Sequence, residues 1–155
     1  MTLVPSKWLR ISILSRMAVP AVITSSIITI SSPFARALVS LGVKEGSKVA
    51  IWATNVPAWY ITFWAATKIG AVLVTVNTAY KIHEAEYLLK QSDTHTLILT
   101  ESFKDSNYAK IIAELCPELE NTEPGKPLHA KRLPFLRNVI TVGFKMPGCL
   151  EWNEA

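Results

Sequence analysis

The sequence predicts an α/β fold in which crossover helices flank a parallel sheet. Half of the 155 residues are hydrophobic, which is enough to bury one domain core. From residue 49 onward, short apolar runs alternate with segments of helical periodicity, as is typical of parallel sheets with right-handed crossovers. The first two runs suit strands covered on both faces. The predicted strands are Val49–Ala53, Val72–Val76, Thr96–Leu99 and Val139–Val142.

The first predicted helix precedes these strands. Ser32 resembles an N-cap and Pro33 stands at the first helical position, so we expect a helix from there to Leu41. Gly42 would then end the helix in the left-handed conformation. The turn that follows leads into the strand at Val49–Ala53.

The second predicted helix follows the first strand. Thr54 or Asn55 can cap it, and apolar residues then recur at helical spacing up to Gly70. We expect Trp59 and Phe63 to pack this helix against the first strand. The residues at that spacing are Trp59, Phe63, Ala66 and Ile69.

Two more helices complete the alternation. His83–Gln91 is the first, and Tyr108–Leu115 is the second, which ends before Pro117. A polar loop, Asn121–Pro134, leads to the last strand. The residues expected to face inward near the first of these helices are Ile82, Tyr87, Leu88 and Leu89.

Residues 1–33 form an atypical apolar leader. A basic start precedes the apolar run MAVPAVITSSIITI, and Ala35-Arg36-Ala37 follows, which together are marks of a secretory signal. Cleavage after Ala37 would cut the first predicted helix, and the run is short for a membrane span. We therefore expect an extended β-branched leader and a cytoplasmic chain, with export or membrane association through residues 1–33 as the alternative.

The charge and the isolated reactive residues indicate no particular chemistry. A net charge of +4 is too small and too scattered to indicate nucleic-acid binding. Cys116 and Cys149 lack metal-ligand spacing, so we interpret them as reduced thiols. His83 lies near Glu84 and Glu86, where helix capping explains it better than acid–base chemistry. Neither His95 nor His129 has an evident partner.

Two features could still meet a ligand. Asn55 and Asn77 each follow a predicted strand, and ligands of parallel sheets bind beyond the carboxyl ends of the strands. A turn is the simpler role for Asn77, because Asn bonds its own neighbours. A basic patch could meet phosphates or anionic lipid, although a charged surface loop is favoured. Its residues are Lys126, His129, Lys131, Arg132 and Arg137.

The segment from Phe34 to Phe103 resembles the N-terminal portion of AMP-forming acyl-CoA synthetases, the adenylate-forming superfamily. The order and spacing of short matches carry the resemblance, which continues weakly to Val142. Upstream of Phe34 the sequence is unlike the family. The matching pieces are Ala35-Arg36-Ala37-Leu38, Leu41-Gly42-Val43, Gly46, Val49-Ala50-Ile51, Asn55-Val56-Pro57 with Trp59, Gly70-Ala71-Val72, Asn77, and Glu86-Tyr87-Leu88-Leu89 before Ser92-Asp93.

The resemblance implies a fold, a reaction and cofactors. Residues 34–155 would be a partial α/β subdomain within the large N-terminal domain of the adenylate-forming fold. The family joins a fatty acid or other carboxylate to coenzyme A, using Mg-ATP and releasing AMP and pyrophosphate. Its phosphate loop, Ser/Thr-Gly-Thr-Thr-Gly-x-Pro-Lys-Gly, is absent from this sequence. We therefore assign no catalytic, cofactor-binding or metal-binding residue.

We expect an N-terminal ligase fragment that is inactive alone, such as a truncated or frameshifted gene would encode. Apolar surface that the family covers would be open, so self-association is expected. The alternative is a non-catalytic α/β module that binds a nucleotide, a lipid or a partner protein.

Overall fold

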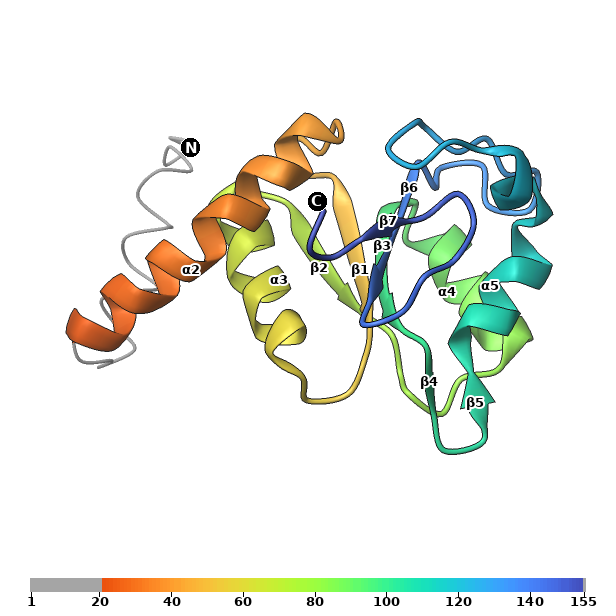
Figure 1. Cartoon of the computed structure of the whole chain (residues 1–155), viewed down its shortest axis with the longest axis horizontal. Coiled ribbons are helices and arrows are strands. Elements are labelled where there is room, and N and C mark those ends of the chain that lie inside the picture. Colours follow the sequence, from red (N-terminus) through yellow and green to blue (C-terminus); the bar gives the residue numbers. More distant parts are fainter. Residues whose placement is uncertain (1–20, 155) are drawn as a thin grey trace, which may run out of the picture.

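The computed structural model describes residues 21–154 and contains a five-stranded parallel sheet (Figure 1). The strand order is β2-β1-β3-β6-β7, and each neighbouring pair is parallel. The predicted fold class is therefore confirmed. The strands are β1 (Lys48–Trp52), β2 (Val72–Thr75), β3 (Thr94–Thr100), β6 (Asn138–Val142) and β7 (Leu150–Glu151).

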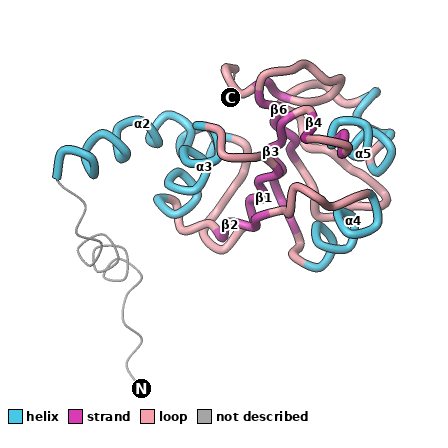
Figure 2. Tube along the Cα trace, turned by 90° about the horizontal axis from the view of Figure 1, so that it is seen from below, coloured by secondary structure: helices cyan, strands magenta, loops and turns pink. Residues whose placement is uncertain are grey.

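Helices cover both faces of the sheet, and the two views in Figures 1 and 2 agree on this arrangement. One face carries α2 (Ala21–Ser40) and α3 (Pro57–Lys68), and the other carries α4 (Ile82–Gln91) and α5 (Tyr108–Leu115). The switch of face follows from the strand order, because the chain passes β1 on its way from β2 to β3.

The central strands are buried on both faces, as predicted for β1. Val49 and Ile51 join the core cluster under α2 and α3, whereas Ala50 and Trp52 join the cluster under α4 and α5. The predicted strand at Val72–Val76 does form, as β2, but the prediction that this strand is buried was wrong. β2 lies at the sheet edge, and Val72 is 49% exposed.

The predicted start of the first helix was also wrong. α2 begins at Ala21, so Pro33 lies inside the helix and residues 21–32 are helical rather than extended. The Ser32-Pro33 pair locally favours a helix start at that point, but packing against the rest of the fold outweighs this preference. Ser31 is buried, and the Ser32 hydroxyl accepts a hydrogen bond from the Lys68 ammonium of α3. The predicted end was right, since Gly42 has a φ of +86° and caps the helix. Residues 1–20 of the leader lie outside the described residues.

Within residues 21–154, no helix is both long enough and apolar enough to cross a membrane. The export signal would be cut after Ala37, yet the helix runs through that position without a break. Phe34 and Ala35 are also buried core residues that such a cut would remove.

The inward faces of two helices differ from the prediction. α3 packs on the sheet mainly through small residues. Trp59 is half-buried against the cluster that contains Val49 and Ile51, as expected, whereas Phe63 is not part of that cluster and instead stacks on Trp59 at 6.1 Å. Its cap is Val56 followed by Pro57, not Thr54 or Asn55. In α4, Tyr87 is 69% exposed. The buried residues of these helices are Ala58, Thr62, Ala65 and Ala66 in α3, and Ala85 and Leu89 in α4.

The predicted polar loop contributes apolar residues to the core. The 3-10 helix η1 (Pro117–Asn121) ends where the loop begins, and the leucines that follow pack in the core cluster under α4 and α5. Three short strands have no signal in the sequence pattern: β4 (Ser102–Phe103), β5 (Ser106–Asn107) and β7. The buried residues of the loop and its continuation are Leu128, Ala130, Leu133 and Leu136.

Candidate functional site

The carboxyl edge of the sheet is the candidate functional site. The strand order reverses between β1 and β3, and ligands of such sheets bind beyond the carboxyl ends at that reversal. Asn55 follows β1, Asn77 follows β2 and Glu101 follows β3, so the sequence placed the two asparagines on the correct edge. The side chain of Asn55 is exposed.

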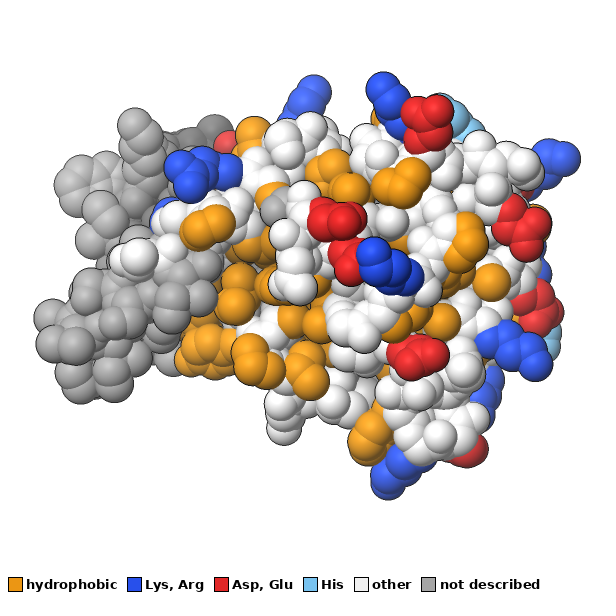
Figure 3. Space-filling model, in the orientation of Figure 1, with side chains coloured by type: hydrophobic (Ala, Val, Ile, Leu, Met, Phe, Trp, Pro, Cys, Tyr) orange, Lys and Arg blue, Asp and Glu red, His pale blue; other side chains and the backbone are white. Residues whose placement is uncertain are grey.

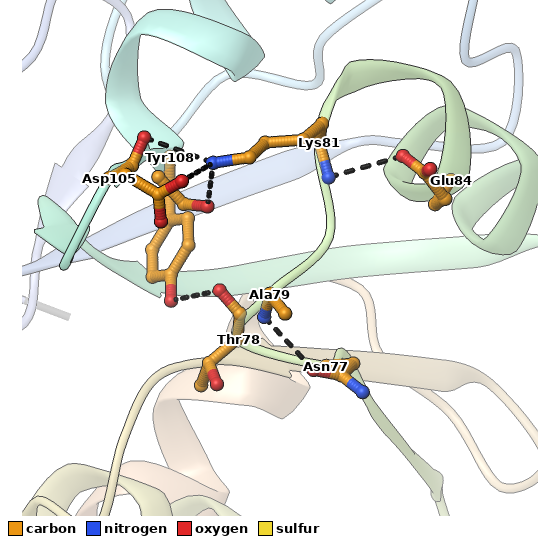
Figure 4. Close-up of polar contacts among 8 residues, drawn as sticks. Asn77, Thr78, Ala79, Lys81, Glu84, Asp105 and Tyr108 are labelled. Carbon is orange, nitrogen blue, oxygen red and sulfur yellow. Dashed lines mark hydrogen bonds and ion pairs between the residues drawn. The ribbon is translucent and has the colours of Figure 1, made fainter.

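Asn77 forms the turn that the sequence analysis favoured (Figure 4). Its Oδ1 accepts a hydrogen bond from the backbone N–H of Ala79 at 2.9 Å, which is an Asx turn. Its carbonyl accepts the indole N–H of Trp52 at 3.1 Å. Next to it, the Thr78 carbonyl accepts the Tyr108 hydroxyl at 2.9 Å. The corner is therefore tied to β1 and α5 by internal bonds.

The aromatic pair beneath this corner is buried. Trp52 and Tyr108 are both fully buried, and their rings stack with centroids 4.3 Å apart. Burial raises the pKa of the Tyr108 hydroxyl. A neutral phenol that already donates to a carbonyl is a structural group rather than a proton-transfer group.

Lys81 joins the same corner to the β4–β5 hairpin. Its ammonium donates to the Asp105 carbonyl at 3.0 Å and to the Ser106 hydroxyl at 2.8 Å, and it pairs with the Asp105 carboxylate at 3.0 Å (Figure 4). The hydrogen bond from Lys81 lowers the pKa of Asp105. The Lys81 backbone N–H donates to the Glu84 carboxylate at 3.2 Å. Glu84 therefore caps α4, and His83 stays exposed.

A groove of about 270 Å³ lies farther along the edge, between α5 and the loop after β6. Its lining combines apolar side chains with four charged ones, Glu101, Lys110, Glu120 and Lys145. Lys145 pairs with Glu151 at 2.5 Å. Sequence reasoning did not single out these residues, because they come from separate elements and share no spacing signal.

The cysteines and the histidine near the core are not reactive groups. Burial raises the pKa of Cys116 and of Cys149 to about 12, so both are thiols at neutral pH. His95 has a partner after all, since its Nδ1 lies 3.0 Å from the Thr96 hydroxyl. Burial, with the Arg137 charge as a smaller cause, lowers the pKa of His95.

The predicted basic patch is partly committed to internal contacts. Arg132 binds both carboxylate oxygens of Glu86, at 2.6 and 3.1 Å. Arg137 donates to the Pro134 and Leu136 carbonyls at 2.7 and 3.1 Å. Lys126 and His129 are exposed. The patch therefore serves the fold in part, as a charged surface loop would.

Several polar groups at this edge are committed to internal contacts. The Lys81 ammonium binds the β4–β5 hairpin, and the Asn77 and Thr78 carbonyls accept hydrogen bonds from Trp52 and Tyr108. Within residues 21–154 no group of three His, Cys, Asp or Glu residues could hold a metal ion.

Comparison with solved structures defines the class of the fold. The structure resembles the anthranilate CoA ligase AuaEII in complex with anthranoyl-AMP, with a TM-score of 0.63 at 23% identity, over 82% of this chain and 20% of that chain. It also resembles the acetoacetyl-CoA synthetase from Streptomyces lividans, with a TM-score of 0.64 at 22% identity, over 83% and 19%. The sheet and its helices are thus those of adenylate-forming CoA ligases.

Sequence comparison gives the family. The model of the family described as AMP-binding enzyme matches residues 29–145. YngI of Bacillus subtilis, named as an acyl-CoA synthetase, is 45% identical over 121 residues, which is 77% of this chain and 22% of YngI. The human medium-chain acyl-CoA ligase ACSF2, mitochondrial, is 38% identical over 77% of this chain and 19% of its own length. This chain belongs to the AMP-binding enzyme family.

Two details refine the sequence prediction. The family match begins at residue 29, upstream of Phe34, so the likeness reaches farther than expected. The chain spans about a fifth of the length of these relatives.

Proposed function

We propose that residues 34–155 are part of the N-terminal α/β subdomain of an AMP-forming acyl-CoA ligase. The identity of 45% to YngI over 121 residues carries the proposal, because the aligned region is long enough to include most of the described sheet. The reaction of such a ligase joins a carboxylate to coenzyme A in two steps. The carboxylate displaces pyrophosphate from ATP, and the thiol of coenzyme A then displaces AMP.

The proposed substrate of the complete ligase is a fatty acid or another carboxylate, with ATP, Mg²⁺ and coenzyme A as the other reactants. The names of YngI and ACSF2 support this class. The contribution of the present residues is scaffolding: they build the sheet edge and the packed corner around Trp52 and Asn77. No step of the reaction is assigned to them.

The chain by itself is proposed to be inactive. The absence of the glycine- and threonine-rich phosphate loop from the sequence supports this. We further propose a cytoplasmic location, which the burial of Phe34 and Ala35 supports against cleavage after Ala37.

The alternative of a non-catalytic module is not favoured, because the similar proteins are named as ligases or synthetases.

A segment exchange tests the scaffold role. The segment of YngI that aligns with this chain is replaced by the matching residues of this chain, and fatty-acid-dependent pyrophosphate exchange is measured. We expect activity in the exchanged protein and background exchange from this chain alone. A folded but inactive exchanged protein would contradict the scaffold role, and exchange by the isolated chain would contradict its inactivity.

The control is the same exchanged protein with Trp52→Ala, which removes the stacking partner of Tyr108 and the donor to Asn77. It should lose activity and melt at a clearly lower temperature than the exchanged protein with Trp52. This control shows whether the assay detects damage to the transferred scaffold.

A further inference from the structure

The amino edge of the sheet, opposite the candidate functional site, holds a half-buried histidine. His95 is the second residue of β3. The end of α2 lies on the same side of the molecule as the amino ends of the strands (Figure 1). A Cβ placed on Gly42, which caps α2, would lie 3.9 Å from the Nε2 atom of His95. The imidazole therefore packs against the turn that ends α2.

His95 also contacts its own strand and the start of β6. Its Nδ1 lies 3.0 Å from the Thr96 hydroxyl. The Arg137 backbone N–H donates to the His95 carbonyl at 2.8 Å. Asn138, the first residue of β6, donates from its side chain to the Leu41 carbonyl at 3.0 Å and so ties β6 to the end of α2. His95 thus lies where three elements meet.

The carbonyl groups at the end of α2 already have hydrogen-bond donors. α2 ends in a Schellman motif, in which the Gly42 and Val43 N–H groups donate back to the last turn. The Asn138 side chain occupies a further carbonyl of that turn. A protonated imidazole donates from both ring nitrogens, and on the Gly42 side it would meet these occupied groups. The occupied carbonyls are those of Leu38, Val39 and Leu41.

The charges around the ring also disfavour protonation. The charged residues next to these contacts along the chain are Lys44, Lys48, Asp93 and Arg137. Burial lowers the pKa of His95 most, and the Arg137 guanidinium lowers it further. The end of a helix attracts a cation and acts in the opposite direction. Because that attraction comes from unsatisfied carbonyls, the occupied carbonyls of α2 leave it weak.

We infer that His95 forms a pH-sensitive contact, which holds the end of α2 on the sheet while the imidazole is neutral and releases that end when the imidazole is protonated. The unfolded chain takes up this proton more readily than the folded chain does. The stabilisation is therefore complete above the unfolded pKa of 6.5 and is lost as pH falls from there through the folded pKa.

Release of the end of α2 would uncover part of the core. Val43, just after the cap, is 2% exposed, and Leu38 in the last turn is fully buried. Both belong to the core cluster that also contains Val49 and Ile51 of β1. The contact is thus a point at which the fold responds to mild acid. It does not depend on the proposed ligase role.

Nuclear magnetic resonance and hydrogen exchange on the full chain, between about pH 5 and 7.5, test this contact. The Cε1 proton of His95 should titrate with a midpoint below 6.5. Over the same range the Gly42 and Val43 amides should lose protection, after correction for the intrinsic pH dependence of exchange. The Cys116 amide, at the end of α5 on the opposite face, should keep its protection. A midpoint at or above 6.5 would show that the helix end favours the cation and would overturn the proposal.

His95→Gln removes the titrating group and keeps a polar side chain. In this variant the Gly42 and Val43 amides should stay protected over the whole pH range. His83→Gln and His129→Gln are the matched controls, because both histidines are exposed, and each should lose protection as the unmodified chain does. A loss that persists in His95→Gln, or one that the Cys116 amide shares equally in the unmodified chain, would overturn the proposal. The titration of the unmodified chain decides the outcome if His95→Gln does not fold.

Discussion

Glu86 is the most strongly paired carboxylate among the described residues. It accepts two hydrogen bonds from Arg132 and one from Lys90, at 2.8 Å, on the next turn of α4. These bonds lower its pKa from 4.5 to about 2, with Arg132 as the largest cause. Because the folded state holds the proton more weakly than the unfolded state, Glu86 stabilises the fold above its unfolded pKa of about 4.5. That stabilisation is lost as pH falls toward 2.

The first prediction concerns Glu86→Gln. The variant keeps the shape of the side chain but removes the charge, so it should melt roughly 2–4 °C lower than the parent at neutral pH. The difference should shrink below pH 4.5 and vanish near pH 2. Thermal unfolding followed by circular dichroism between pH 2 and 7 measures it. A difference that stays constant with pH would show that the ion pairs are not its source.

Gly148 supports a second prediction at this scale. It has a φ of +71°, and a Cβ there would lie 2.2 Å from the Leu119 carbonyl oxygen. Gly148→Ala should therefore lower the free energy of unfolding by about 3–4 kcal/mol, through backbone strain and a clash with main chain. Urea denaturation measures the loss.

Gly46→Ala is the matched control. Gly46 has a φ of +79°, but a Cβ there would meet no atom within 4 Å. This variant should cost only about 1 kcal/mol, the strain alone. Equal losses in the two variants would show that the Leu119 contact is unimportant.

At the scale of elements, α3 shows how a helix can be apolar and still turn its aromatic residues outward. Its small residues, including Ala65 and Ala66, lie against the sheet, and this lets the helix axis approach the strands closely. Larger side chains on that face would force the helix away. The aromatic residues therefore occupy the flanks and the outer face, which the expected spacing of Trp59 and Phe63 did not reveal.

The third prediction compares two tryptophans. Trp52→Ala should lower the free energy of unfolding by about 3–5 kcal/mol, because the side chain is fully buried, stacked on Tyr108 and bonded to Asn77. Trp59→Ala should cost clearly less, because Trp59 is half-buried. Urea denaturation of both variants decides the order. A larger loss for Trp59 would show that its contact with the cluster around Val49 and Ile51 contributes more than the full burial of Trp52.

For the whole molecule, the two core clusters share the same strands. Leu97 and Leu99 of β3 belong to the cluster under α5, and Ile98 belongs to the cluster under α3. Loss of β3 would open both clusters at once. The described residues should therefore unfold as one cooperative unit, even though the α3 face carries exposed apolar surface.

The fourth prediction combines cooperative unfolding with the exposed apolar surface over α3 (Figure 3). Tyr60 of α3 is 53% exposed. The chain should show a single melting transition by near- and far-ultraviolet circular dichroism, and it should still bind a hydrophobic dye in the folded state. Tyr60→Glu should lower the dye fluorescence without broadening the transition. Transitions that differ between the two spectral regions would instead indicate a loosely packed globule.

The sequence by itself determined the alternation of strands and helices and the family. Alternation depends on local periodicity, and the apolar runs at Val49–Ala53 and Thr96–Leu99 are strong local signals. The bounds of α5 were also predictable, because Asn107 caps it and Pro117 follows its end. The Asn77 turn was also predictable from local sequence, because its hydrogen bond joins residues only two positions apart.

Only the tertiary structure decided which strand lies at the edge, where α2 starts and which helix faces are buried. The position of β2 at the edge depends on pairing between distant segments, and an edge strand can be as apolar as a central one. Ser32-Pro33 carries a local start signal, but the helix continues upstream of it, where Ser31 is buried and Ser32 contacts Lys68 of α3. Each of these outcomes depends on contacts between residues far apart in the chain, which local periodicity does not encode.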